Sequence, residues 1–262
     1  MNPDIIESIK KIAQEELPHR FANVAHSFKE DGSFLTEADL SVQQRIQGLL
    51  KEQFPDIGFL GEEMPVEEQK KALLSPYGVW ILDPIDGTSN FSAGIPYYAV
   101  SLAYIKEGII EWGMVYDPER DECFNASHSK GAFLNGEPLL KSTNNLSIAN
   151  STAVIDFKRL NGDLAARIAS QPPYSSQRSF GGVALDWCWL AAGRFHLYLH
   201  GKQNIWDYAA GYLIFKEVGG NACTLQSEPI YDFSLNPRSA VAALDETLFL
   251  DWCDYLKIDI SL

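Results

Sequence analysis

Hydrophobic residues recur at helical spacing in the first part of the chain, and this pattern predicts two helices. The first covers residues 3–17, whose apolar face carries Ile5, Ile6, Ile9, Ile12, Ala13 and Leu17. Asn2 is its expected N-cap and Pro3 its first helical residue. The second helix begins at Thr36 and ends before Pro55, and its apolar face carries Leu40, Ile46, Leu49, Leu50 and Phe54.

Short apolar runs then predict strands at 78–82, 98–105, 109–116 and 122–126. Asn135-Gly136 is a strong hairpin turn signal. The second half contains one strand at 194–199 and helices around 163–170, 182–192, 207–218 and 245–257. Segment 171–177 is a short internal connection. This interleaving of strands and helices predicts a mixed α/β or α+β protein. We expect residues 1–262 to form a single unit, with a weak boundary near 145–150 between an N-terminal half (1–148) and a C-terminal half (149–262).

Charge and cysteine usage narrow the class of protein. The chain has 21 Lys and Arg against 35 Asp and Glu, a formal net charge of −14, which argues against a broad nucleic-acid groove and an anionic membrane surface. Its four cysteines form no C-x-x-C motif and are expected to be reduced and mostly buried. A cytoplasmic location is expected because the sequence shows neither a signal-peptide pattern nor an apolar run of the ~20 residues that a membrane span needs.

Candidate chemistry is concentrated in residues 80–91, WILDPIDGTSNF. An apolar strand there delivers Asp83 and Asp86, three positions apart, at a point where Pro84 is expected to turn the chain. Two carboxylates at a strand end can bind hard cations through oxygen, with the Ile85 carbonyl as a further ligand. An Asp-Pro turn without any ligand is the structural alternative.

The residues that follow favour a ligand site over a plain turn. Gly87 allows the backbone to come close to a ligand, and the amides around Thr88 and Ser89 could hold an anion if a helix or nest begins there. A lone D-P-x-D pattern is typical of a turn, whereas D-P-x-D followed by G-T-S favours a binding site.

Three further acids are weak candidates individually. Glu62 follows a short apolar run and is also explained as part of a solvated acidic turn. Asp207 is also explained as the N-cap of the helix after it, and Asp39, three residues after Thr36, as part of a capping box. Together, an oxygen-only set without His or Cys points to Mg²⁺ rather than Zn²⁺, and its members are Glu62, Asp83, Asp86 and Asp207.

These segments resemble the inositol monophosphatase family of Mg²⁺-dependent, lithium-sensitive phosphatases. The matching segments are L-T-E-A-D (35–39), G-E-E (61–63), the 80–91 motif and W-D-Y-A-A-G (206–211), and they span most of the chain. The resemblance implies the sugar-phosphatase fold, a layered α/β/α/β/α sandwich that is usually a homodimer. It also implies two or three Mg²⁺ ions and a small phosphomonoester substrate.

By position, the resemblance also implies individual roles. The metal ligands would be Glu62, Asp83, the Ile85 carbonyl, Asp86 and Asp207. Gly87, Thr88 and Ser89 would bind phosphate, and Asp39 with Thr88 would orient the attacking water. The implied reaction is in-line hydrolysis of inositol monophosphate by metal-activated water, without a phosphoenzyme.

The substrate side departs from the family's pattern. Segment 178–183, RSFGGV, resembles a family segment whose small residues face the substrate, so the residues expected there, beside Asp86, are Gly181, Gly182 and Val183. Inositol-specific members carry Glu seven residues before the W-D aspartate, and here that position is His200. A His is no fixed anionic acceptor and could instead contact another polar group or a second anion, although a solvated turn residue explains His200 equally well.

Other activities stay open at this point. The same chemistry could act on histidinol phosphate, fructose bisphosphate, a nucleotide phosphate or a sugar phosphate. A regulatory role with transcription or ribosomal-RNA machinery is an alternative of another class. A haloacid-dehalogenase phosphatase is disfavoured because its two acids lie two positions apart, and sequence signatures of P-loop, dinucleotide-binding, serine-hydrolase and zincin proteins are absent.

Overall fold

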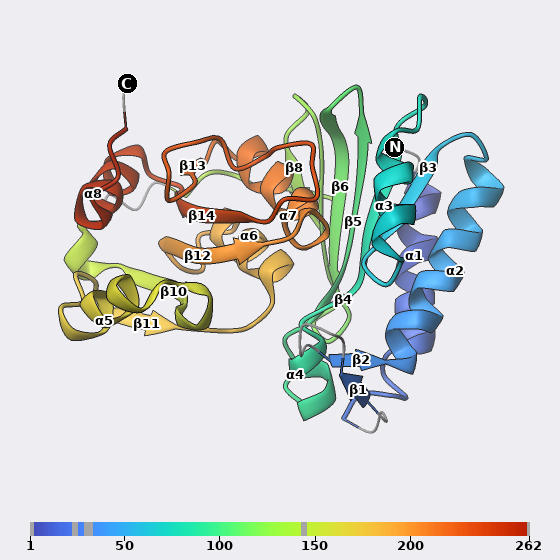
Figure 1. Cartoon of the computed structure of the whole chain (residues 1–262), viewed down its shortest axis with the longest axis horizontal. Coiled ribbons are helices and arrows are strands. Elements are labelled where there is room, and N and C mark those ends of the chain that lie inside the picture. The colour runs from blue at the N-terminus through green and yellow to red at the C-terminus, as the bar shows by residue number, and fades with distance from the viewer. Residues whose placement is uncertain (1–2, 23–25, 29–33, 143–145, 261–262) are drawn as a thin grey trace.

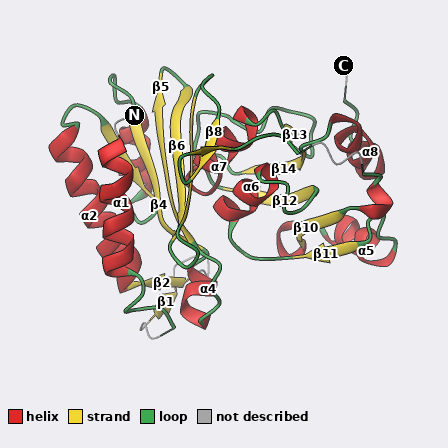
Figure 2. Cartoon of the chain, turned by 180° about the vertical axis from the view of Figure 1, so that it is seen from behind, coloured by secondary structure: helices red, strands yellow, loops and turns green. Residues whose placement is uncertain are grey.

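The computed structural model describes residues 3–22, 26–28, 34–142 and 146–260. Within this part of the chain, two sheets alternate with three layers of helices (Figures 1 and 2). The helices are α1 (Pro3–Glu16), α2 (Glu37–Gln53), α3 (Val66–Leu73), α4 (Thr88–Ala93), α5 (Gly162–Ser170), α6 (Val183–Ala191), α7 (Ile205–Glu217) and α8 (Glu246–Leu256), with short 3₁₀ turns η1 (Ile148–Asn150) and η2 (Phe157–Arg159).

The larger sheet has seven strands in sequence order, and only β3 and β4 pair in parallel. Its strands are β3 (Gly58–Gly61), β4 (Val79–Asp86), β5 (Ala99–Lys106), β6 (Ile109–Asp117), β7 (Glu122–Ser127), β8 (Ala132–Leu134) and β9 (Glu137–Pro138). The turn between β8 and β9 is the predicted one, because Asn135 and Gly136 both have positive φ. A separate small hairpin pairs β1 (His26–Phe28) with β2 (Phe34–Thr36).

The smaller sheet has five strands in the order β11-β10-β12-β14-β13. Strand β10 pairs in parallel with both of its neighbours, which aligns the carboxyl ends of β10 and β12. The strands are β10 (Thr152–Asp156), β11 (Ser176–Arg178), β12 (Leu197–Gln203), β13 (Asn221–Cys223) and β14 (Arg238–Ala243).

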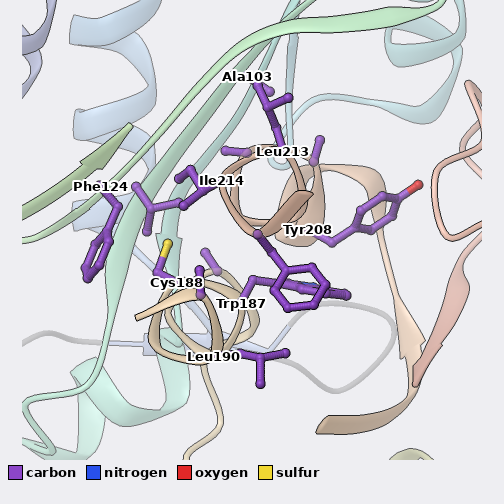
Figure 3. Close-up of a cluster of buried hydrophobic side chains, with 14 of the residues drawn as sticks. Ala103, Phe124, Trp187, Cys188, Leu190, Tyr208, Leu213 and Ile214 are labelled. Carbon is purple, nitrogen blue, oxygen red and sulfur yellow. The ribbon is translucent and has the colours of Figure 1, made fainter. Parts of the chain in front are cut away.

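Side-chain alternation along the strands explains the layering. Trp80 and Leu82 on β4 pack with α1 and α2, whereas Val79 and Ile81 face the opposite side and pack in the cluster that contains α6 and α7. Figure 3 shows Trp187 of α6 and Ile214 of α7 in this central cluster. Helices α5 and α8 cover the outer face of the smaller sheet. The resulting order is α/β/α/β/α, as predicted.

Several local predictions need correction. Strand β4 does not turn at Pro84 but continues to Asp86, because the pairing with β5 is irregular between Asp83 and Asp86, where a proline without an N–H is tolerated. Leu40, expected on the apolar face of α2, is 40% exposed.

Further differences concern the second half and the N-terminus. The strand expected at 194–199 is shifted to β12, and the end of the connection 171–177 belongs to the edge strand β11. Asn2, the expected cap of α1, lies outside the described residues. The four cysteines are buried and free, as expected.

Candidate functional site

A polar cavity of about 210 Å³ lies between the two halves of the chain. It is lined by the end of β4, the start of α4, the N-termini of α6 and α7, and the carboxyl ends of β10 and β12. The sequence-predicted residues that line it are Glu62, Asp83, Ile85, Asp86, Gly87, Thr88, Ser89, Gly181, Gly182, Val183, His200 and Asp207. One predicted residue, Asp39, does not line the cavity.

Two buried carboxylates at the end of β4 are fixed by backbone N–H groups. The Asp83 side chain is 2% exposed, and its Oδ1 accepts a hydrogen bond from the Ile85 N–H at 3.0 Å. Asp86 accepts from the N–H groups of Val183 (3.1 Å) and Ala184 (2.7 Å). These N–H groups belong to the first turn of α6, where a negative charge is favoured by the helix dipole.

The other two acids of the predicted metal set reach the cavity from β3 and α7. Glu62 follows β3, and its N–H donates to the Leu82 carbonyl of β4 at 3.0 Å, which places it beside Asp83. Asp207 is not the N-cap of α7. That helix begins two residues earlier, at Ile205, so Asp207 is its third residue, and its Oδ2 accepts from the N–H of the N-cap residue Asn204 at 2.7 Å.

We call Glu62, Asp83, Asp86 and Asp207 the acidic cluster. Burial raises the pKa of Asp83, Asp86 and Asp207, and charge repulsion from Glu62 adds to this in each case. The pKa of Asp86 rises to about 8, although the two N–H groups of α6 oppose the shift. Ionised carboxylates so close together are unfavourable without a counter-charge, so the cluster is expected to bind either protons or cations.

The donor chemistry of the acidic cluster fits a hard divalent cation. All four side chains offer oxygen, the Ile85 carbonyl lies between two of them, and no Cys lines the described cavity. The side chains do not yet form a closed ligand group: among the described residues, no three His, Cys, Asp or Glu converge closely enough to hold an ion. The cluster therefore fits Mg²⁺ by charge, ligand type and burial, and not by a preformed cage.

The start of α4 forms the next part of the cavity lining. Gly87 precedes α4 with φ 91°, and a Cβ at this position would lie 2.9 Å from the Tyr97 carbonyl oxygen. The Thr88 hydroxyl faces two acceptors, the Ile85 carbonyl at 2.9 Å and Asp39 Oδ1 at 3.3 Å. Asp39 is fully buried behind Thr88. Its Oδ2 accepts from the Thr36 N–H at 2.8 Å, so the predicted capping box is present and coexists with the contact to Thr88.

The segment before α6 carries the predicted substrate-facing residues. Asn90 Nδ2 donates to the Phe180 carbonyl at 2.7 Å and so ties this segment to α4. An ideal Cβ at Gly182 would lie 3.3 Å from Asp86 Oδ2, so the small residue leaves space beside a carboxylate of the acidic cluster.

His200 is not a solvated turn residue. It lies on β12, is 5% exposed, and stands opposite Asp156 in the parallel pairing of β10 and β12. Its Nδ1 accepts from the Lys202 N–H at 3.2 Å, and its Nε2 lies 3.1 Å from Asp156 Oδ2. With Nδ1 accepting from the Lys202 N–H, the Nε2–H of the ring donates to Asp156.

Six polar residues of the described lining were not predicted as site residues, namely Asp156, Arg159, Ser179, Asp186, Lys202 and Asn204. Asp156 ends the apolar run 152–156, which is β10, and the carboxyl end of a parallel strand is a position where ligands bind in α/β sheets. The apolar run 152–156 is therefore the sequence signal that could have predicted Asp156 as a lining residue. Lys202 follows His200 by two positions, but Arg159 reaches the cavity from η2, and no local pattern indicates it.

Five layers with a carboxylate-lined cavity between the sheets define a layered α/β/α/β/α protein with an oxygen-rich site. The chain matches the family model of the inositol monophosphatase family over residues 4–252. It belongs to this family and is a phosphatase that hydrolyses phosphoric monoesters. None of its described helices is long and apolar enough to cross a membrane.

Relatives with different names share much of the chain. An inositol-1-monophosphatase of Caulobacter vibrioides is 34% identical over 84% of this chain and 88% of its own length. A fructose-1,6-bisphosphatase/inositol-1-monophosphatase of Thermotoga maritima is 30% identical over 88% and 87%. A Nus factor SuhB of Pasteurella multocida is 32% identical over 75% and 74%. These names show that the family is broad, so membership does not identify the substrate.

Solved structures agree with this assignment. An inositol monophosphatase of Thermotoga maritima superimposes with a TM-score of 0.81 at 28% identity and covers 96% of both chains. An inositol monophosphatase/NADP phosphatase in complex with Mg²⁺ and phosphate superimposes with a TM-score of 0.81 at 25% identity and covers 95% of this chain and 93% of its own.

Proposed function

We propose that this phosphatase hydrolyses small phosphomonoesters, inositol monophosphate among them, by in-line attack of water and without a phosphoenzyme. The observation that carries the proposal is the convergence of the acidic cluster from β3, β4 and α7 on one cavity, next to the start of α4. Two or three Mg²⁺ ions, when bound, would neutralise the phosphate charge, stabilise the leaving oxygen and activate the water.

The acidic cluster and the Ile85 carbonyl would hold these ions. Backbone N–H groups occupy part of the acceptor capacity of Asp83, Asp86 and Asp207 and fix how their carboxylates point. Each carboxylate oxygen has a further lone pair, so a fixed carboxylate can bind a cation without losing its anchor. This arrangement limits the reorganisation needed when the ions bind.

The start of α4 would bind the phosphate. The first N–H groups of a helix have no partner inside the helix, and here they belong to Thr88 and Ser89, which line the cavity. The positive φ of Gly87 lets the chain leave β4 and begin this helix directly beside Asp86.

Thr88 would be the catalytic residue that touches the attacking water. Its hydroxyl has one proton, which it donates to Asp39 Oδ1 or to the Ile85 carbonyl, while its oxygen lone pairs accept from water. Asp39 is buried behind Thr88 and would act through it, so we assign Asp39 as a positioning residue.

Direct attack by water is supported by the lack of a cysteine or a free histidine in the described cavity lining. Its only histidine, His200, donates to Asp156, and no cysteine lines it. As in the family, we expect Li⁺ to inhibit by replacing a Mg²⁺ and two copies of the chain to form a homodimer.

Phosphate release from a substrate panel tests the proposal. The panel contains inositol 1-phosphate, glycerol 2-phosphate, fructose 1,6-bisphosphate and histidinol phosphate, each with Mg²⁺ and with EDTA. We expect Mg²⁺-dependent release from inositol 1-phosphate and glycerol 2-phosphate at comparable rates. Activity that EDTA leaves unchanged would contradict the metal assignment, and a strong preference for histidinol phosphate would contradict inositol monophosphate as a substrate.

A further inference from the structure

Two cationic side chains line the cavity together with the acidic cluster. Arg159 and Lys202, which we call the basic pair, are the only Lys or Arg residues in the described lining. Both are exposed, and neither forms an ion pair with another described residue. The cavity of this acidic chain, whose net charge is −14, therefore also contains two cationic side chains.

The backbone holds the basic pair in a defined place. Gly201, between His200 and Lys202, packs directly on the Arg159 backbone, and a Cβ at Gly201 would overlap the Arg159 carbonyl oxygen. Asp156 Oδ1 accepts from the Lys158 N–H at 3.0 Å and caps η2, whose last residue is Arg159. These contacts fix η2 against β12, so both basic side chains begin at the same edge of the smaller sheet.

Arg159 also lies close to the acidic cluster. Burial raises the pKa of Asp207, and the Arg159 charge opposes this rise. Burial alone would also raise the pKa of Asp156, but the contact with His200 and the Lys158 N–H lower it below its usual value, and the Arg159 charge adds to this lowering. The guanidinium is therefore within electrostatic reach of both Asp207 and the His200–Asp156 pair.

The same region offers no free ring nitrogen of His200 to a neutral sugar or polyol. Both ring nitrogens of His200 are engaged, Nδ1 by the Lys202 N–H and Nε2 by Asp156. The Asp156 carboxylate in turn accepts from His200 and from the Lys158 N–H. The basic pair supplies the two positive side chains of this part of the lining, and these can bind an anion.

We propose that the preferred substrate carries a second anionic group, a phosphate or a carboxylate, which Arg159 and Lys202 bind while the acidic cluster processes the phosphate ester. This inference rests on the proposed function and assigns a substrate class to the same site. A guanidinium can hold either anion through two parallel N–H donors, and an ammonium adds a mobile point charge.

Matched substrate pairs test this inference. Fructose 1,6-bisphosphate differs from fructose 1-phosphate by one phosphate, and 2-phosphoglycerate differs from glycerol 2-phosphate by one carboxylate. We expect the wild type to favour the member with the second anionic group in at least one pair by about tenfold to a hundredfold in kcat/KM, mainly through KM. The pair that shows the preference identifies the second group as phosphate or carboxylate.

The variants Arg159→Gln and Lys202→Gln, alone and combined, remove the charges. We expect the combined variant to lose the preference: kcat/KM for the member with the second anionic group should fall about tenfold or more relative to kcat/KM for the other member, which has no second anion for the basic pair to bind. Lys158→Gln is the matched control, since Lys158 is exposed and adjacent but does not line the cavity, and it should retain the preference.

The result separates the inference from the proposed function. A wild type that treats both members of each pair alike, or a combined variant that keeps the preference, overturns the inference while phosphatase activity stands. Should no substrate release phosphate, the proposed function fails, and the inference is then decided by calorimetric Kd values for the same pairs with Mg²⁺. Equal Kd values within each pair would overturn it.

Discussion

The acidic cluster and the basic pair line the same cavity but are built in opposite ways. Asp83 and Asp86 are buried, and Asp83, Asp86 and Asp207 each accept backbone N–H groups that fix the carboxylates. Arg159 and Lys202 are exposed, and only their backbones are fixed. From this difference we infer that the fixed carboxylates take part in the reaction, whereas the exposed basic side chains select the substrate.

The largest expected effect comes from Asp83→Asn in the acidic cluster. The Asn carbonyl oxygen can still accept from the Ile85 N–H, so the fold should persist while the charge that binds the cation is lost. We expect kcat with Mg²⁺ to fall by about a thousandfold or more. Initial rates with glycerol 2-phosphate measure this effect.

Asp251→Asn is the control for Asp83→Asn, because Asp251 is an exposed acid of α8 outside the cavity. The control should keep wild-type kcat. Mg²⁺ should raise the Tm of the wild type and of the control, but not that of Asp83→Asn. Near-normal Mg²⁺-dependent turnover by Asp83→Asn would contradict the assignment of the acidic cluster as the site that binds the catalytic Mg²⁺.

Asp39→Asn should have a smaller effect, because Asp39 acts through Thr88. We expect kcat to fall by about tenfold to a hundredfold with KM little changed, and the pH profile of kcat to shift. The variant also weakens the capping box of α2, which should cost about 1 kcal/mol.

Thr36→Ala separates these two consequences. It removes the capping side chain of α2 and its 2.6 Å hydrogen bond to Asp39 Oδ2, but it leaves the Thr36 N–H on that oxygen and the Thr88–Asp39 contact. It should therefore lower Tm by a few degrees and leave kcat nearly unchanged. If Thr36→Ala lowered kcat as much as Asp39→Asn does, Asp39 would be a structural residue and not a positioning residue for the reaction.

The dependence of the free energy of unfolding on pH should show the effect of the buried carboxylates in the acidic cluster. The folded pKa of Asp86, about 8, lies above that of an ordinary Asp, so the folded protein holds an extra proton between about pH 4 and 8. Its contribution to the free energy of unfolding is fully present below about pH 4 and is lost as pH rises through about 8.

Thermal unfolding in EDTA between pH 5 and 8 measures this loss. We expect the wild type to lose several degrees of Tm relative to Asp86→Asn as pH rises, and saturating Mg²⁺ to abolish the difference in slope. The slopes are compared because Asn replaces an acceptor of the Ala184 N–H and so adds an offset that does not depend on pH. Parallel slopes in EDTA would contradict the raised pKa of Asp86 in the folded protein.

The smallest expected effect concerns salt and the basic pair. Exposed charges are screened at high ionic strength, so raising NaCl from about 20 mM to 0.5 M should raise KM for fructose 1,6-bisphosphate about threefold to tenfold more than KM for fructose 1-phosphate. The combined Arg159→Gln and Lys202→Gln variant should show equal salt effects for both substrates. A wild type with equal salt effects would argue that the pair does not contact the substrate.

The same contrast explains what the sequence could predict. Asp83, Asp86 and the residues up to Ser89 belong to one continuous motif, so a local pattern predicts them as a ligand site. The pattern of elements predicts only a mixed α/β or α+β class, and the layered fold is predicted from the resemblance to the inositol monophosphatase family. Asp207 was found, but its place in α7 was wrong, because an acid at N3 and an acid at the N-cap give similar patterns.

The substrate side depends on contacts between distant segments. His200 resembled a turn residue because Gly201 and Lys202 follow it, yet the parallel pairing of β10 with β12 buries it against Asp156. Arg159 enters the cavity because Gly201 allows η2 to pack on β12. Neither contact leaves a periodic signal in the sequence, so these residues became visible only in the folded chain.

The most direct test of the central claim is anomalous diffraction from crystals of the wild type grown with Mn²⁺ in place of Mg²⁺. The account predicts two or three anomalous peaks in the cavity, in contact with carboxylates of the acidic cluster and with the Ile85 carbonyl. Crystals that diffract well but show no peak at the acidic cluster, or only peaks elsewhere on the molecule, would contradict it.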